Sequence, residues 1–208
     1  MRQSTIFRAG LVALVSLLFV AAAPGPVTGQ VRLVPQVGLY APQSDLPSAD
    51  EAVEVGERES TLAFGLGLEI GSAEGTALRI AALHGTGEEV PVDGVGCTEC
   101  ARSTVSALPA LAVLRPIPKL VVFHPYLLAG GGVRRLDFSR EDLAEEQFDA
   151  LFADETTFAG HLGVGGALDL GPLDLSVEVT DVISSFESPE GESELLHDLF
   201  VMVGLSIG

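Results

Sequence analysis

The sequence predicts an all-β fold, a closed antiparallel up-and-down transmembrane β-barrel of about eight strands. Three observations predict it. Segments of roughly ten residues alternate between apolar and polar or small side chains. The connections between these segments are in turn short and then long and acidic. An apolar run near the N-terminus has the length of a signal-peptide core. Lipid requires apolar residues on one strand face and a closed hydrogen-bonded sheet, which this pattern supplies.

The first element is a secretory signal. Arg2 and Arg8 precede the apolar run 11–23, which is too short to span a bilayer as a helix. The side chains at the −3 and −1 positions are of the small or tolerated kind found before a signal-peptide cleavage site, which places the cleavage between Gly29 and Gln30. We therefore predict a signal peptide at 1–29 and one barrel domain at 30–208. An uncleaved inner-membrane anchor is the alternative.

Eight later segments show the two-residue period of a strand. In order, they are 31–40, 61–70, 77–83, 104–114, 120–134, 158–169, 173–182 and 199–207. The clearest is 61–70, where Leu62, Phe64, Leu66, Leu68 and Ile70 share one face. In 104–114, leucines fall on both faces, so the inward face of that strand stays open.

Charged residues share a strand face with glycines, while the other face is almost purely aliphatic. A water-soluble barrel shows the reverse arrangement, although periodicity alone leaves it as an alternative. We therefore expect the aliphatic face to contact lipid and the polar face to line a narrow lumen. The lumen is predicted to hold a polar network of Arg32, Glu69, Arg79, His124, Tyr126, Arg134, His161, Asp169, Asp174 and Glu178. Symmetric pairing about the turn 71–75 places Glu69 beside Arg79.

The connections predict the orientation. The short turns 71–75, 115–119 and 171–172 alternate with acidic stretches at 45–59, 88–99, 137–155 and 187–198. Outer-membrane barrels have short periplasmic turns and long external loops, so both termini should be periplasmic. The chain has 29 acidic and 11 basic residues, which disfavours nucleic acid as a partner. No stretch follows a calcium-loop pattern, and no cofactor is expected.

Two strand motifs accompany this predicted architecture. They are Pro125-Tyr126-Leu127 to Gly130-Gly131-Gly132, and Gly163-Val164-Gly165. Together they resemble the OmpA/OmpX-like eight-stranded outer-membrane barrels over roughly the whole mature chain. The resemblance implies residence in the bacterial outer membrane, contact with its lipid, and handling by the barrel-assembly machinery. Two features depart from that family. The chain ends in Gly208 rather than Phe or Trp, and without Trp its aromatic girdle is poor.

Cys97 and Cys100 form a CxxC pair. Redox-active pairs of this kind begin a helix in a βαβ unit, and a structural zinc site needs four ligands. Neither context is present in this sequence. In an external loop of an oxidising compartment, a local disulfide is the favoured interpretation.

Four polar residues offer the side chains of a Ser-His-acid catalytic set. His124, His161, Ser176 and Glu178 are all predicted to face the lumen, where a Ser-His-acid set would need hydrogen-bond contact. An inward network that fills a narrow barrel explains them better, so no enzyme is predicted. The glycines of 160–166 precede no helix, which argues against nucleotide binding.

Two function classes remain open. The first is a structural or surface-interaction barrel whose acidic loops meet an extracellular partner. The second is a transport or binding barrel for a small hydrophobic molecule. Within 137–155 a short helix is expected, with Ala144, Phe148, Leu151 and Phe152 on one face, either as a flap on the rim or as a recognition element. A filled lumen would favour the first class, and a continuous tunnel the second.

Overall fold

The computed structural model describes residues 30–44, 58–72, 75–92, 97–117, 122–142, 144–145, 148–149, 152–171, 173–187 and 193–207. The predicted signal peptide, 1–29, and the centres of several connections lie outside these residues. Within the described part of the chain, no helix is both long enough and apolar enough to cross a membrane.

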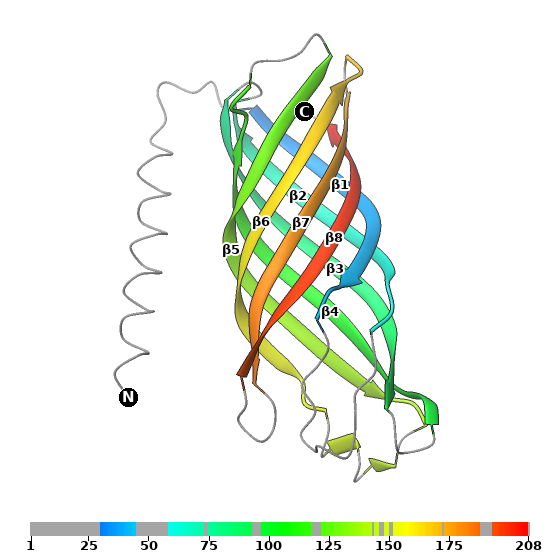
Figure 1. Ribbon diagram of the computed structural model, residues 1–208. Helices are drawn as coiled ribbons and strands as arrows, with labels where there is room; N and C mark the ends of the chain where they lie inside the picture. The colour runs from blue at the N-terminus through cyan, green and yellow to red at the C-terminus, as the bar shows by residue number, and fades with distance from the viewer. Residues whose placement is uncertain are drawn as a thin grey trace, which may run out of the picture.

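Eight strands form one closed antiparallel barrel in which each strand pairs with its sequence neighbours and β8 returns to β1 (Figure 1). This confirms the predicted fold class. The strands are β1 Gln30–Pro42, β2 Thr61–Gly71, β3 Thr76–Val92, β4 Cys97–Leu114, β5 Phe123–Arg140, β6 Glu155–Asp169, β7 Leu173–Glu187 and β8 Ser193–Ile207.

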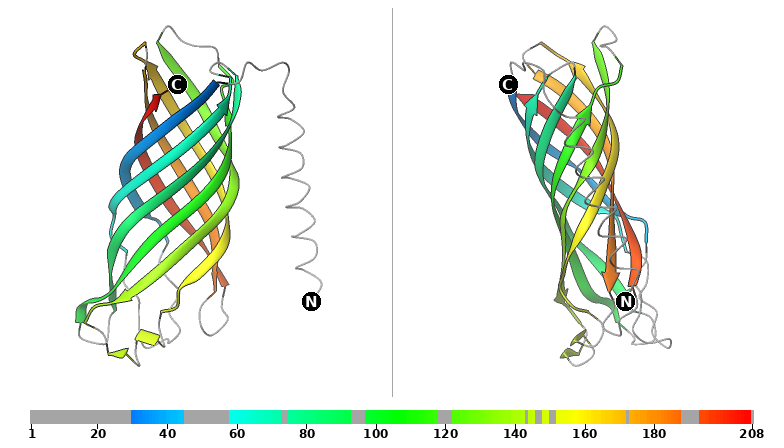
Figure 2. Two further views of the ribbon diagram at one scale, coloured as in Figure 1. Left: turned by 180° about the vertical axis from the view of Figure 1, so that it is seen from behind. Right: turned by 90° about the vertical axis from the view of Figure 1, so that its left-hand side faces the viewer.

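The two ends of the barrel differ (Figure 2). One end carries the β2–β3, β4–β5 and β6–β7 turns. The start of β1 and the end of β8 lie at the same end, where Leu33 pairs with Ile207. We call it the short-turn end. The β6–β7 turn contains Gly171 with a φ of +91°, a left-handed conformation that glycine adopts without a steric penalty. The opposite end, where the other connections lie, is the long-loop end.

The strands extend further than the sequence predicted, mainly toward the long-loop end. β3 runs to Val92 rather than to residue 83, β4 begins at Cys97 rather than at 104, and β5 reaches Arg140. The acidic stretches 88–99 and 187–198 therefore consist largely of strand. The predicted ends were wrong because they were set where apolar alternation stops. Beyond the apolar surface, outward side chains become polar while backbone pairing continues.

The side-chain alternation separates an inner from an outer face. On β2, Leu62 is 55% exposed and Leu66 51%, whereas Ala63 is fully buried. The same parity holds on β4, whose faces the sequence left open. There Val105, Ala107 and Leu111 are buried inside, and Leu108 is 59% exposed outside. The core of the protein is therefore the barrel interior.

The β5–β6 connection folds over the long-loop end. Its backbone makes two helical hydrogen bonds, from the Phe148 N–H to the Ala144 carbonyl and from the Phe152 N–H to the Phe148 carbonyl, both 2.9 Å. Phe152 is buried, and its ring centroid lies 5.1 Å from that of Phe138 on β5. The predicted helical segment is thus present as a helical turn packed on the barrel rim. Leu151 lies outside the described residues.

Candidate functional site

The outer surface of the barrel carries an apolar belt. Aliphatic and aromatic side chains on all eight strands point outward and are largely exposed. On β2 the belt runs from Leu62 to Ile70, nine positions, close to the ~9–11 residues that a tilted strand needs to cross a bilayer. Toward the long-loop end, the belt gives way to polar outward side chains. These form a boundary ring of His84, Ser106, Arg135, Thr156, Asp181 and His197.

The register of the sheet aligns much of this ring. His84 pairs with Ser106, Ser106 with Arg135, and Arg135 with Thr156, so four adjacent strands change from apolar to polar in one row. His84 Nδ1 lies 3.0 Å from the Ser106 hydroxyl oxygen. On the other side of the barrel, His197 Nδ1 lies 3.0 Å from Asp181 Oδ2. From β3 to β6 this row therefore marks the edge of the surface that suits hydrocarbon, whereas on β7 and β8 apolar outward side chains continue to Ile183 and Leu195.

Inside the barrel, nearer the short-turn end, lies a charged cluster that we call the Arg79 cluster. It consists of Gln36, Glu69, Arg79, Arg115, Tyr126 and Glu178. Arg79 Nη2 lies 2.9 Å from Glu69 Oε2, and Arg79 Nη1 lies 2.6 Å from Glu178 Oε2. The Glu69–Arg79 pair predicted from the sequence is therefore present, and the two residues are direct cross-strand partners.

The Arg79 cluster balances its own charge. Arg115 Nη2 lies 2.6 Å from Glu69 Oε1, and the Tyr126 hydroxyl donates to Glu178 Oε2 at 2.9 Å. Gln36 also donates to Glu178. Two guanidinium groups thus face two carboxylates, and each carboxylate has further donors, which makes burial of the charges tolerable. Gly165 gives Tyr126 its space, since an added Cβ there would lie 2.5 Å from the Tyr126 ring.

A second cluster, the Asp198 cluster, fills the lumen nearer the long-loop end. Asp198 Oδ1 on β8 accepts hydrogen bonds from Arg58 at 3.0 Å and from the Tyr40 hydroxyl at 2.8 Å. Asp198 Oδ2 forms an ion pair with Arg134 Nη2 at 2.7 Å. Arg58 comes from the β1–β2 connection and also donates to the Ser44 carbonyl at 2.8 Å. The side chains of Arg58 and Asp198 are 0% exposed. The Arg58 side chain therefore fills part of the lumen near this mouth.

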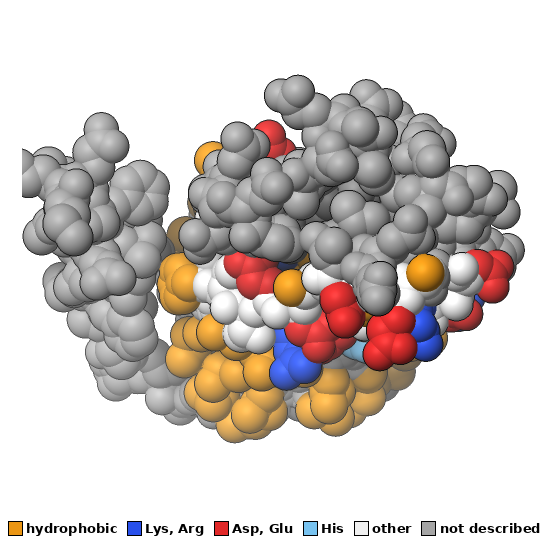
Figure 3. All heavy atoms as spheres, turned by 90° about the horizontal axis from the view of Figure 1, so that it is seen from below, with side chains coloured by type: hydrophobic (Ala, Val, Ile, Leu, Met, Phe, Trp, Pro, Cys, Tyr) orange, Lys and Arg blue, Asp and Glu red, His pale blue; other side chains and the backbone are white. Residues whose placement is uncertain are grey.

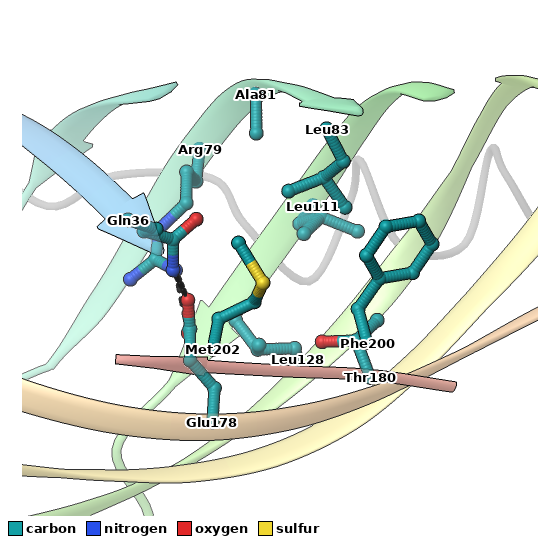
Figure 4. Close-up of a pocket in the computed structure, with 10 residues that line it drawn as sticks. All are labelled: Gln36, Arg79, Ala81, Leu83, Leu111, Leu128, Glu178, Thr180, Phe200 and Met202. Atoms are coloured by element: carbon teal, nitrogen blue, oxygen red, sulfur yellow. Dashed lines mark hydrogen bonds and ion pairs between the residues drawn. The ribbon is translucent and has the colours of Figure 1, made fainter. Parts of the chain in front are cut away.

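Between the two clusters lies an apolar band. Leu83, Leu111, Leu128, Phe200 and Met202 point into the same section of the lumen from four strands (Figure 4). Thr180 adds a polar side chain to that section. The cavity among these residues has about 10 Å³ of water-accessible space, the low end of what one water molecule needs. The section is therefore filled by side chains.

The structure distributes the ten predicted lumen residues over several places. Glu69, Arg79, Tyr126 and Glu178 meet in the Arg79 cluster, and Arg134 belongs to the Asp198 cluster. At the short-turn mouth, Arg32 Nη1 lies 3.5 Å from Asp174 Oδ2, and Asp169 accepts the Gly171 N–H at 2.8 Å. His124 is half-buried near the same mouth, whereas His161 is fully buried deeper in the lumen.

Sequence reasoning missed Arg58, Arg115 and Asp198. The two arginines lie in connections, where no strand period indicates which way a side chain points. For Asp198, the residue period of the last strand does indicate an inward side chain. In the predicted strand 199–207, Phe200 and Met202 lie on the face opposite the aliphatic one, and extending that strand by one residue places Asp198 on the same face.

The structure does not assemble a Ser-His-acid set from the residues weighed for it. The Ser176 hydroxyl and both ring nitrogens of His161 have no hydrogen-bond partner among the described residues. A nucleophile needs a base within hydrogen-bond reach. The described part of the chain also holds no group of three or more His, Cys, Asp or Glu side chains placed to hold a metal ion.

The backbone of both cysteines lies in β4, where pairing with β3 is irregular. From Ala101 to Cys97, β4 advances four residues, while β3 advances only from Val90 to Val92. The side chains of Cys97 and Cys100 lie outside what the structure describes. Their disulfide therefore stays a prediction.

No protein-family model matches the chain, and no curated protein matches its sequence. Solved structures do resemble it. Neisserial surface protein A matches with a TM-score of 0.58 and 9% identity, over 86% of this chain and 97% of that chain. The outer membrane protein OprG from Pseudomonas aeruginosa matches with a TM-score of 0.54 and 17% identity, over 85% and 94% of the two chains. At such identities the likeness is one of fold, that of the small eight-stranded outer-membrane barrels.

Proposed function

We propose that this chain is an integral outer-membrane barrel with a structural or surface-interaction role and without catalysis. One observation carries the proposal, namely a barrel with an apolar outer belt and an interior filled by side chains. The short-turn end, where β1 begins and β8 ends, would face the periplasm, and the long-loop end would face outward.

The belt supports residence in a membrane. Leu33, Leu66, Val164 and Val203 are each about half exposed, and similar residues surround the whole barrel. A soluble monomer rarely exposes a contiguous apolar surface larger than a few hundred Å². The boundary ring then gives the depth of insertion, because polar outward side chains begin there on adjacent strands. A water-soluble barrel, the alternative left by the sequence, would have the opposite arrangement of faces.

The filled lumen supports a role that needs no passage through the barrel. Two charged clusters and the apolar band occupy the interior in succession. An eight-stranded barrel has an interior just wide enough for side chains or one small ligand. The surface available to a partner is then the long-loop end. There, acidic side chains of the described residues are prominent beside a few basic ones (Figure 3). A basic protein surface, or divalent cations bridging to anionic lipid, would complement this charge.

The test combines location with permeability. After expression of the full chain in a Gram-negative host, we expect the protein in the outer-membrane fraction and a shift in gel mobility when the sample is heated. Protein purified from these membranes should give no ion current in planar bilayers above the protein-free baseline. Recovery in the soluble fraction would overturn the membrane assignment. A steady current from the unaltered protein would overturn the closed lumen.

One observation favours the second class, a barrel that binds a small hydrophobic molecule. The lumen nearer the long-loop end has an apolar core, and Phe138 and Phe148 pack against it beside Phe152. These rings come from β5 and the β5–β6 connection. Saturable binding of the fluorescent probe N-phenyl-1-naphthylamine, strengthened by Phe152→Ala, would favour this class. Binding that does not saturate beyond the partitioning seen with empty micelles would favour the first.

A further inference from the structure

We infer that the apolar band, rather than either charged cluster, is the barrier that keeps ions and water from crossing the barrel. The band consists of Leu83, Leu111, Leu128, Phe200 and Met202. This inference rests on the proposed function, since it identifies the residues that close the lumen.

The band separates the two clusters physically. Gln36, Arg79 and Glu178 border the cavity on the short-turn side (Figure 4). On the other side, the Phe200 ring packs against Tyr40 with 5.2 Å between ring centroids, and the Tyr40 hydroxyl belongs to the Asp198 cluster. A path through the lumen from one cluster to the other therefore has to pass Phe200 and its apolar neighbours.

The band also fills its section of the barrel. An added Cβ at Gly65, on the wall of β2, would lie 2.9 Å from Leu83 Cδ2 and 3.2 Å from Met202 Cε. Leu83 is the cross-strand partner of Gly65, and Met202 reaches the same wall from β8. With only about 10 Å³ of water-accessible space left among them, there is no room for a chain of water molecules.

The charged clusters are weaker barriers because water can replace their contacts. On the short-turn side, the exposed fraction of the side chains falls gradually, from 24% at Asp174 and 13% at Arg32 to 4% at Arg79. Water entering this mouth can exchange hydrogen bonds with the charged groups at little net loss.

The lumen around the Asp198 cluster also offers sites for water. Arg134 Nε, the Ser184 hydroxyl and the ring nitrogens of His161 have no hydrogen-bond partner among the described residues, although all are buried. Buried polar groups of this kind are commonly satisfied by ordered water. The side chains of the apolar band offer a water molecule or an ion no hydrogen bond, and Thr180 supplies one hydroxyl beside them. An ion that entered this section would lose most of its hydration without compensation.

The experiment compares conductance in planar bilayers for protein purified from membranes after expression of the full chain. The first band variant combines Phe200→Ala with Met202→Ala and removes volume. The second, Met202→Gln, keeps most of the volume and adds polarity. Val201→Ala is the matched control, because Val201 lies between the two band residues on β8 but points outward. Heat-dependent gel mobility confirms that each variant is folded.

The charged cluster is tested in the same assay with Arg79→Ala combined with Glu178→Ala. If that variant does not fold, the nearly isosteric Glu178→Gln replaces it. We expect both band variants to carry a current that the unaltered protein, the Val201 control and the cluster variant do not carry. Current through the cluster variant, with or without current through the band variants, would overturn the inference, and so would silent band variants. Current through the unaltered protein would instead overturn the proposed closed barrel.

Discussion

Arg134 on β5 and Asp198 on β8 are joined across the lumen by an ion pair, with 2.7 Å between Nη2 and Oδ2. Asp198 also holds Arg58 of the β1–β2 connection at 3.0 Å. One carboxylate therefore links two strands that are not neighbours in the sheet, and it fastens a connection into the mouth of the barrel. A single aspartate thus contacts guanidinium groups from two distant parts of the chain.

Replacing Asp198 with alanine should destabilise the barrel strongly. The change leaves Arg58 and Arg134 buried without this carboxylate, and removing one partner of a buried ion pair typically costs about 3–5 kcal/mol. Urea titration of the protein in lipid vesicles measures the free energy of unfolding. Asp181→Ala is the control, since Asp181 pairs with a partly exposed His197 on the outer face, where pairs contribute about 0–1 kcal/mol. Equal losses for the two variants would argue against a structural role for the Asp198 cluster.

The Arg79 cluster predicts a specific coupling between Arg79 and Glu178. Among the described residues, Arg79→Met leaves Glu178 without a cation, whereas Glu69 keeps Arg115 at 2.6 Å. The single change should cost about 3–5 kcal/mol, and adding Glu178→Gln should recover part of that loss because the unpaired carboxylate is gone.

The matched control is Arg79→Met with Glu69→Gln, which should give no recovery. The Glu69–Arg79 pair taken alone would predict that Glu69→Gln relieves the loss of Arg79. In the network of ion pairs, Glu69 keeps a second cation, so the carboxylate whose removal should relieve the loss of Arg79 is Glu178. Unfolding free energies that are additive for Arg79 and Glu178 would contradict the coupling.

The fold was predictable because lipid imposes a strict period of two on each strand. Leu62, Leu66 and Ile70 share the outer face of β2 as that period requires, and the Glu69–Arg79 pairing followed from counting residues about one turn. Strand ends were less predictable. Beyond the boundary ring the outward side chains of β3 and β4 need not be apolar, so the extra length of these strands gave no regular alternation, although Val90 and Ala101 are buried inside.

The interior was only partly predictable, because parity shows which way a side chain points but not what it meets. Phe200 and Met202 were expected inside, yet their convergence with Leu83 depends on the stagger of strands across the closed barrel. Arg58 reaches the lumen from a connection, where no period applies. The predicted polar network therefore did not reveal the apolar band between the two clusters.

Cys97 and Cys100 are expected to form a disulfide whose loss leaves the barrel folded. The bridge would close a loop of only a few residues, so it would constrain little of the unfolded chain. Its site lies where β3 and β4 pair irregularly, beyond the apolar belt. Maleimide labelling of the purified protein without reductant should modify neither thiol, and labelling after reduction should modify both. Two reactive thiols before reduction would contradict the bridge, and loss of heat-dependent gel mobility in Cys97→Ser with Cys100→Ser would contradict its dispensability.

The apolar belt predicts that the effect of a charge depends on its depth in the membrane. Leu66 is 51% exposed near the middle of the belt on β2, and His84 lies in the boundary ring on the neighbouring strand. Leu66→Arg should lower the free energy of unfolding in lipid vesicles by about 2–4 kcal/mol, whereas His84→Arg should lower it by only about 0–1 kcal/mol.

Both substitutions place the same cation on the same outer surface, so their difference isolates depth from any general effect of arginine. Leu66→Ala separates the loss of the leucine side chain from the gain of charge. An environment-sensitive fluorophore on a cysteine at position 66 should report hydrocarbon, and one at position 84 should report the interface. If both arginine variants were equally stable, and the label at position 66 reported water, the belt would not be embedded in lipid. The water-soluble barrel would then account better for the chain.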